Sequence, residues 1–196
     1  PSGIVSRAGG CYPVCMNPIA LPLAQPVTVL VAPQAARDAM LDLTARLALH
    51  GPLRVLDGGN HFNAYAVARG LRRQTARVEE ALGRIRMARA FTCYQMLALL
   101  RDASAGSAPT LVLDLLCTFY DDSVPLPEAR RLLGAVLAEV ERLGRGGAVV
   151  ISTRPPAQAG PERLALVDVL CEALPARLLY PAEALPAPAR QMRLFV

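Results

Sequence analysis

The stretch VTVLVAPQAARDAM, from Val27 to Met40, decides the fold that we expect of this chain. Residues 27–31 form a short run of apolar and β-branched side chains, which is typical of a strand covered on both faces. Pro33 opens a turn, and apolar residues at helical spacing follow from Met40. A strand, a short turn and a helix in this order are also the layout of a phosphate-binding loop. The turn contains neither glycine nor lysine, so the layout is present without the residues that such loops use.

The rest of the chain repeats the alternation of strand and helix. Beyond residues 27–31 we predict strands at residues 53–56, 85–88, 110–120, 148–152, 177–180 and 191–196. The helical patterns fall near residues 40–48, 62–71, 75–82, 94–100, 129–140 and 162–174. This order predicts an α/β fold with a doubly wound, mostly parallel sheet that carries helices on both faces. Ligands bind beyond the carboxyl ends of the strands in such folds, which directs attention to the loops at residues 32–38, 57–60, 118–127 and 153–161.

The length of 196 residues fits about one domain. We predict a Pro-rich arm or linker at residues 1–26 and one domain at residues 27–196. No apolar run approaches the ~20 residues of a membrane helix, so we expect no membrane partner. The five cysteines are odd in number and mostly lie in apolar segments, which fits reduced thiols in the cytoplasm. The role of the local pair Cys11 and Cys15 stays open.

No residue is predicted to be catalytic or to hold a metal ion. Zinc needs about four ligands, and the only two histidines, His50 and His61, lie beside turn residues where solvated or capping roles are favoured. Ser152 has no nucleophile motif around it. Cys93 precedes a predicted helix, a position that can lower a thiol pKa, but a buried packing role is the favoured interpretation.

The basic residues of the chain are all arginines. The 21 Lys and Arg residues include no lysine, and the net charge of +5 is compatible with an anionic partner. A third of these cations fall within 21 residues, at Arg69, Arg72, Arg73, Arg77, Arg84, Arg86 and Arg89. Such a cluster suits a phosphate backbone, with Tyr65 or Tyr94 stacking on a base, and the alternative is an ordinary solvated helix face. The predicted nucleic-acid contacts are Arg69, Arg72, Arg73, Arg77, Arg154 and Arg163.

Several segments resemble the RecA/RadA-type recombinase ATPases. The segment RIRMARAFTCYQMLALL, residues 84–100, is similar to a family stretch in which a short strand ends in an ARAF-like turn before a helix. VLDGG is placed like the family's second strand with its catalytic acid, LVLDLL like its Walker B strand, and AVVISTR like the strand before its second DNA loop. The resemblance covers residues 27–154 and implies a RecA-like core.

The resemblance also indicates what is missing from the loop. In the family pattern GxxxxGK[ST], backbone N–H groups and Lys hold the phosphates, and Ser/Thr holds Mg²⁺. The corresponding positions here are Ala32, Arg37, Asp38 and Ala39. A carboxylate in place of Lys reverses the sign of a contact worth about 4 kcal/mol at ~4 Å. Arg37 offers a charge, but its bulk stands where the family needs glycine. We therefore predict that no nucleotide cofactor binds.

The acidic residues of the family site are mostly missing as well. The family's Glu corresponds to Gly59, and Asp57 is either a stand-in or, as the favoured interpretation, a cap of the following turn. Asp114 is the one Walker-type residue that remains. Without metal and phosphates, we expect it to hydrogen-bond a neighbouring turn or the helix after the degenerate loop. These differences predict a pseudo-ATPase without catalytic residues.

Binding is the activity left to such a protein. Recombinases hold single-stranded DNA in the loops after the Walker B strand and after the next strand. Here the first loop carries Asp121, Asp122 and Glu128 and no arginine, and the second offers only Arg154 and Arg163. Family members also assemble head to tail, so we expect a protein partner, either an active RecA-type ATPase or a second copy, and/or single-stranded DNA. The alternative is a weak or atypical nucleotide-binding ATPase.

Overall fold

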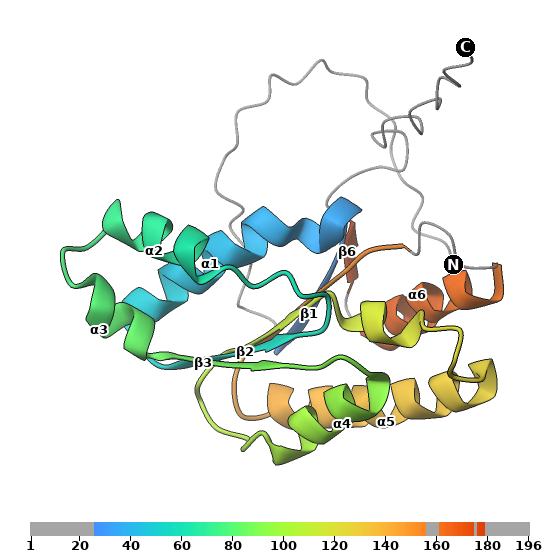
Figure 1. The fold of residues 1–196 in the computed structure, drawn as a ribbon. Coiled ribbons are helices and arrows are strands. Elements are labelled where there is room, and N and C mark those ends of the chain that lie inside the picture. The colour runs from blue at the N-terminus through green and yellow to red at the C-terminus, as the bar shows by residue number, and fades with distance from the viewer. Residues whose placement is uncertain (1–25, 156–160, 175, 179–196) are drawn as a thin grey trace, which may run out of the picture.

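The computed structural model describes residues 26–155, 161–174 and 176–178 (Figure 1). The predicted Pro-rich arm, except for Pro26, lies outside the described residues. So do the pair Cys11 and Cys15 and the strand predicted at residues 191–196. Apart from Pro26, the described residues all belong to the domain predicted at residues 27–196.

Six strands form one sheet in which every neighbouring pair is parallel. They are β1 (Val27–Val31), β2 (Leu53–Asp57), β3 (Ile85–Arg89), β4 (Thr110–Leu113), β5 (Val149–Thr153) and β6 (Ala176–Leu178). Their order across the sheet is β3-β2-β4-β5-β1-β6. The first strand thus lies inside the sheet, and the chain extends the sheet from it in both directions, which is the doubly wound topology that the sequence predicts.

Helices cover both faces of the sheet (Figure 1). On one face lie α1 (Arg37–His50), α2 (Ala64–Arg72) and α3 (Val78–Gly83), and on the other α4 (Cys93–Asp102), α5 (Leu126–Gly144) and α6 (Pro161–Ala173). Successive side chains of a strand point to opposite faces. Val29 therefore packs with the layer of α4, α5 and α6, and Leu30 packs with the layer of α1, α2 and α3. The predicted α/β class, with a parallel sheet between two helical layers, is confirmed.

Apolar residues at helical spacing hold the longest helix, α5, on the sheet. Leu132, Leu133, Val136 and Val140 are buried along one stripe of α5 and belong to the same core cluster as Val29. Burial of each such side chain contributes ~1.5–3 kcal/mol relative to exposure. The stripe therefore fixes the position of α5, and with it the segment that leads from β4 into this helix.

The strand predicted at residues 110–120 is correct only over its first four residues. β4 ends at Leu113, and Leu115–Phe119 form a 3-10 helix, η2. Between them Asp114 has φ 51° and ψ 57°, a left-handed conformation that turns the chain out of the sheet. The prediction fails here because a continuous apolar run fits a buried strand and a buried helical turn equally well.

Candidate functional site

The carboxyl ends of the four central strands meet at one edge of the sheet. The register pairs Asp57 of β2 with Leu113 of β4, and Val31 of β1 with Thr153 of β5. Polar side chains that are 0% exposed gather at these ends: Asp57, Asp114, Ser152 and Thr153. Buried polar groups are uncommon and call for partners. Because this edge is also where ligands bind in parallel α/β sheets, it is the candidate functional site.

The loop after β1 is folded on itself instead of being open toward a ligand. Its 3-10 turn η1 (Pro33–Ala36) places Gln34, Ala35 and Ala36 at φ 51°, 53° and 50°. Each left-handed non-glycine residue costs about 1–2 kcal/mol, so the loop has this shape because its surroundings impose it. The N–H of Ala35 donates to the carbonyl of Ala32 at 3.0 Å, and the N–H of Arg37 donates to the carbonyl of Gln34. These two N–H groups are therefore bonded within the turn, whereas a phosphate-binding loop directs its N–H groups at the anion.

The residues that the sequence analysis compares with the Walker A signature differ in burial. Ala32 is buried, Arg37 and Asp38 are exposed and Ala39 is half-buried. A carboxylate in the first helical turn is stabilised by the helix dipole. Asp38 therefore adds a negative charge to the first turn of α1, which disfavours a phosphate there.

Asp57, at the end of β2, caps the turn that follows it. Its carboxylate accepts the N–H of His61 at 2.9 Å and the N–H of Phe62 at 3.0 Å. The guanidinium of Arg89 also lies 3.2 Å from this carboxylate. The interpretation of Asp57 as a cap is confirmed. Arg89 of the predicted basic cluster pairs with Asp57, so its charge is already engaged within the chain.

Asp114 is fully buried and faces two side chains from other loops. Its Oδ2 lies 3.0 Å from Nε of Arg154 and 3.8 Å from Nε2 of His61. The contact with Arg154 is an ion pair that lacks hydrogen-bond geometry, so both carboxylate oxygens, like Nδ1 of His61, have no hydrogen-bond partner among the described residues. Burial raises the pKa of the Asp114 carboxyl, and the charges of Arg154 and His61 oppose the rise. We expected Asp114 to hydrogen-bond a neighbouring turn or α1. The carboxylate instead forms an ion pair with Arg154, which directly follows β5.

Arg154, directly after β5, is held in place by the residues of η2. Its guanidinium donates to Sγ of Cys117 at 3.3 Å, and its carbonyl accepts the hydroxyl of Tyr120 at 2.8 Å. Burial raises the pKa of Tyr120, so this hydroxyl keeps its proton and remains a donor. The Arg154 side chain is 40% exposed, which leaves one side of the ion pair in contact with solvent.

Two glycines make room for Asp114. A Cβ built on Gly59 would lie 2.6 Å from Cβ and 2.6 Å from Oδ2 of Asp114, and one on Gly58 would lie 2.9 Å from the Asp114 carbonyl. The DGG sequence is therefore required by the close approach of the loop after β2 to the end of β4. Gly59 therefore cannot be replaced by a residue with a side chain while Asp114 is in this conformation.

His61 is the site residue that the sequence analysis misplaces. A solvated or capping role is favoured from the sequence, but the His61 side chain is 14% exposed and faces Asp114. The available signal is its place in the chain: it follows the end of β2 by four residues, and β2 pairs with β4, which ends directly before Asp114. Nδ1 of His61 has no hydrogen-bond partner among the described residues.

The other sequence candidates for chemistry have structural roles. Ser152 accepts the backbone N–H of Asp114 at 3.1 Å, which helps to hold its left-handed turn. Cys93 is fully buried, and burial raises the pKa of its thiol, so the packing role is confirmed. Among the described residues, no group of three or more His, Cys, Asp or Glu side chains is placed to hold a metal ion.

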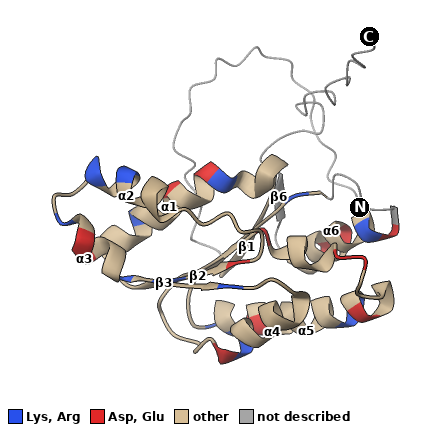
Figure 2. Ribbon diagram, in the orientation of Figure 1, with Lys and Arg blue, Asp and Glu red and all other residues tan. Residues whose placement is uncertain are grey.

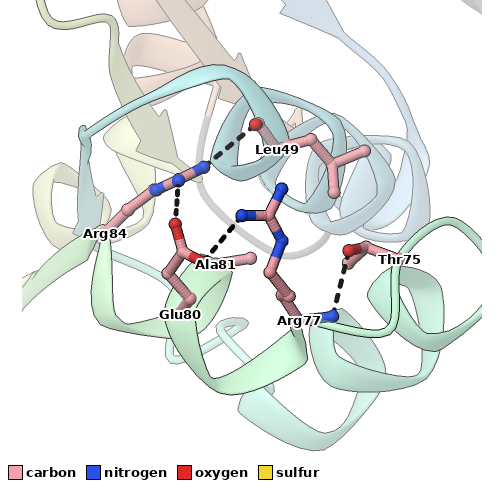
Figure 3. A pocket seen from close by; sticks show the side chains of 6 residues that line it. All are labelled: Leu49, Thr75, Arg77, Glu80, Ala81 and Arg84. Atoms are coloured by element: carbon pink, nitrogen blue, oxygen red, sulfur yellow. Dashed lines mark hydrogen bonds and ion pairs between the residues drawn. The ribbon is translucent and has the colours of Figure 1, made fainter.

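The arginines predicted to contact nucleic acid fall into two groups: some bind other groups of the chain, and the others are exposed and have no side-chain partner among the described residues. Arg163 is buried and donates to the carbonyls of Phe119 and Val124, both at 2.6 Å, so it is not available as a surface contact. Arg154 is paired with Asp114. Arg77 lies 3.5 Å from Glu80, in a small pocket that Leu49, Thr75, Glu80, Ala81 and Arg84 also line (Figure 3).

Arg84, in the same pocket, pairs with Glu80 and donates to the carbonyls of Ala48 and Leu49 at the end of α1. Its role is to cap that helix. Three of the predicted contacts, Arg69, Arg72 and Arg73, are exposed and make no ion pair or side-chain hydrogen bond within the described part of the chain.

Comparison with known proteins does not assign a family. No protein-family model matches the chain, and no curated protein matches it. Within the ranges that the structure describes, none of the helices combines the length and the apolar character needed to cross a membrane.

Proposed function

We propose that this chain is a RecA-like accessory protein of DNA recombination or repair that does not hydrolyse ATP. It acts by binding a protein partner and/or single-stranded DNA in the cytoplasm, and the protein partner is an active RecA-type ATPase or a second copy of the chain. The placement of the segments that resemble the recombinases supports a RecA-like core. They occupy β3, β2, β4, β5 and β1, which are consecutive neighbours in the sheet.

The single observation that carries the proposal is the ion pair between Asp114 and Arg154. In P-loop ATPases the Walker B aspartate holds the Mg²⁺ that bridges the phosphates. Asp114 has the corresponding place in the sequence, but the guanidinium of Arg154 lies 3.0 Å from its Oδ2. The chain itself supplies the positive charge that Mg²⁺ would supply, and a metal ion would have to displace it.

The loop after β1 supports the same conclusion independently. The N–H groups of Ala35 and Arg37 donate to carbonyls of their own turn. The side chain in the place of the Walker lysine is the exposed carboxylate of Asp38, which repels a triphosphate. The chain therefore offers a nucleotide neither these two backbone N–H donors nor a lysine for its phosphates, and Arg154 stands beside Asp114 in the place of Mg²⁺.

One observation favours the alternative of an atypical nucleotide-binding protein. The two carboxylate oxygens of Asp114 have no hydrogen-bond partner among the described residues, so their lone pairs remain open to a cation that enters from outside. In this alternative Arg154 swings toward solvent, which its 40% exposure allows, and Mg²⁺ takes its place.

Thermal unfolding with and without ATP and Mg²⁺, together with a phosphate-release assay, separates the two functions. The proposal predicts an unchanged melting temperature at ATP concentrations of about 1 mM and no release of phosphate above buffer. A Mg²⁺-dependent rise in melting temperature that Asp114→Asn abolishes would establish the alternative. Purified chain added to an active RecA-type ATPase is expected to change its turnover or its assembly state, and co-sedimentation of the two proteins measures the contact directly.

A further inference from the structure

The outer face of α2 carries a stripe of one tyrosine and three arginines. Tyr65, Arg69 and Arg72 are spaced by four and three residues, so they share one side of a helix with 3.6 residues per turn, and Arg73 directly follows the helix. Val67, Ala68 and Leu71 form the opposite, buried side. We call Tyr65, Arg69, Arg72 and Arg73 the α2 stripe. It spans about 12 Å along the helix axis.

The arginines of the α2 stripe are not neutralised by the chain. Ion pairs engage Arg77, Arg84 and Arg89 of the same predicted cluster, but no ion pair involves the three stripe arginines in the described ranges. Glu80 of α3 already pairs with both Arg77 and Arg84. Figure 2 shows the basic segments of α2 at one side of the molecule, with the acidic residues of α3 on a separate helix. The three exposed guanidinium groups of the α2 stripe therefore remain for an anionic partner, as does that of Arg86 on β3, which is also exposed and without an ion pair in the described ranges.

One exposed aromatic ring accompanies these charges on α2. Tyr65 is 70% exposed at the start of this helix. Phe91 is 71% exposed, but it lies between β3 and α4, in the opposite helical layer, and is not part of this surface. Tyr94 is also exposed, but its hydroxyl contacts Glu128 at 3.4 Å, in an acidic neighbourhood that is unsuited to phosphate.

We propose that the α2 stripe forms a binding surface for single-stranded nucleic acid. The arginines contact phosphates, and Tyr65 stacks on an unpaired base. An exposed ring stacks on bases only where they are not already paired and stacked, which favours a single strand over a duplex. Protein interfaces also use Tyr and Arg, but they surround them with an apolar core, and α2 itself exposes no large apolar side chain besides Tyr65.

This surface is separate from the two loops that the recombinase family uses for DNA. The loop after β4 contains the exposed residues Asp121 and Asp122, and Arg154 of the loop after β5 is paired with Asp114. The inference rests on the proposed function in treating the chain as a binding protein. It names the nucleic-acid partner and the surface that this proposal left open.

Fluorescence anisotropy of labelled dT20 with the full chain tests the proposal, with U20, a 20-base-pair duplex and heparin as further probes. We expect binding to dT20 or U20 that weakens with salt, and the tighter of the two identifies DNA or RNA as the source. Arg72→Ala/Arg73→Ala should reduce the slope of log K against log salt by about 1.4, since each phosphate contact of a single strand contributes about 0.7. Tyr65→Ala should weaken binding about fivefold or more without a change in this slope.

The matched control is Arg130→Ala/Arg145→Ala, which removes the same charge from exposed positions on α5 and at its C-cap, in the opposite helical layer. Equal losses in the two arginine variants, binding to heparin or duplex as tight as to dT20, or no binding at low salt would overturn the inference. The outcomes are distinguishable from failure of the proposed function. Absence of oligonucleotide binding leaves the non-catalytic accessory role in place through a protein partner, whereas ATP turnover would contradict that role whatever the α2 stripe binds.

Discussion

Removal of Arg154 should destabilise the fold because it leaves a buried carboxylate without its counter-ion. Asp114 is 0% exposed, and Arg154 lies 3.0 Å from it. Breaking one side of a fully buried ion pair costs about 3–5 kcal/mol. The Arg154 side chain is 40% exposed, so solvent screens part of the interaction, and we expect Arg154→Ala to lower the free energy of unfolding by about 2 kcal/mol. For a domain of this size the melting temperature should fall by about 4–8 °C.

The pH dependence of this loss identifies its cause. Burial raises the pKa of Asp114 above its value in the unfolded chain, and Arg154 opposes the rise, so Arg154→Ala raises that pKa further. The folded chain then binds this proton more tightly than the unfolded chain does. Stability is accordingly regained as the pH falls through the folded pKa, and the cost of the ionised carboxylate is fully present above it. The loss in Arg154→Ala should be largest at alkaline pH and shrink as the pH is lowered through the raised pKa of Asp114.

A double-mutant cycle with Asp114→Asn, followed by urea unfolding, measures the interaction. The neutral amide removes the buried charge, so Arg154→Ala should cost much less in the Asp114→Asn background than in the native chain. Arg130→Ala is the control, since this arginine is exposed on α5, and we expect a change within about 0.5 kcal/mol. Additive effects of the two site substitutions, or a loss that grows as the pH is lowered, would refute the reasoning.

Three further substitutions test other parts of the structure by urea unfolding. Gly59→Ala places a Cβ 2.6 Å from Asp114 and should lower the free energy of unfolding by about 2 kcal/mol or more. The control is Gly134→Ala, whose Cβ would have nothing within 4 Å and should stabilise α5 by about 0.5–1 kcal/mol. Equal effects of the two substitutions would contradict the close approach of Gly59 to Asp114. Asn63→Ala removes the side-chain cap of α2 and should cost about 1 kcal/mol, with faster amide exchange in the first turn; unchanged exchange would exclude the cap. Arg163→Ala leaves two carbonyls without their donor and should cost about 2–3 kcal/mol, and a neutral result would show that this arginine is free.

The sequence predicts the layers of this fold well because hydrophobic periodicity alone determines them. Val27–Val31 is buried at every position, as its uninterrupted apolar pattern indicates, and α5 follows its 3.6-residue stripe. The same criterion fails after Leu113, where apolar residues continue but the strand does not. The left-handed conformation of Asp114 cannot be predicted from the pattern of apolar residues, because it depends on the contacts around this residue in the folded chain.

The candidate site is predictable in its location but not in its contacts. The order of strands and loops directs attention to the loop at residues 32–38, and the resemblance to the recombinases directs attention to Asp114. The ion pair between Asp114 and Arg154 joins residues 40 positions apart in the chain, each directly after a strand, and the sequence alone does not specify that these two strands are adjacent. Arg163 fails as a predicted surface residue for a related reason: arginines are mostly exposed, and this one is buried because two backbone carbonyls lie within reach of its guanidinium.

The most direct test of the central claim is a crystal structure of the chain grown with ATP and Mn²⁺, with anomalous data collected for manganese. The account predicts no anomalous peak beside Asp114, no phosphate density along residues 32–39, and an Arg154 guanidinium that stays in contact with the Asp114 carboxylate. A manganese ion bound by Asp114, with Arg154 turned away and a triphosphate at the start of α1, would contradict it.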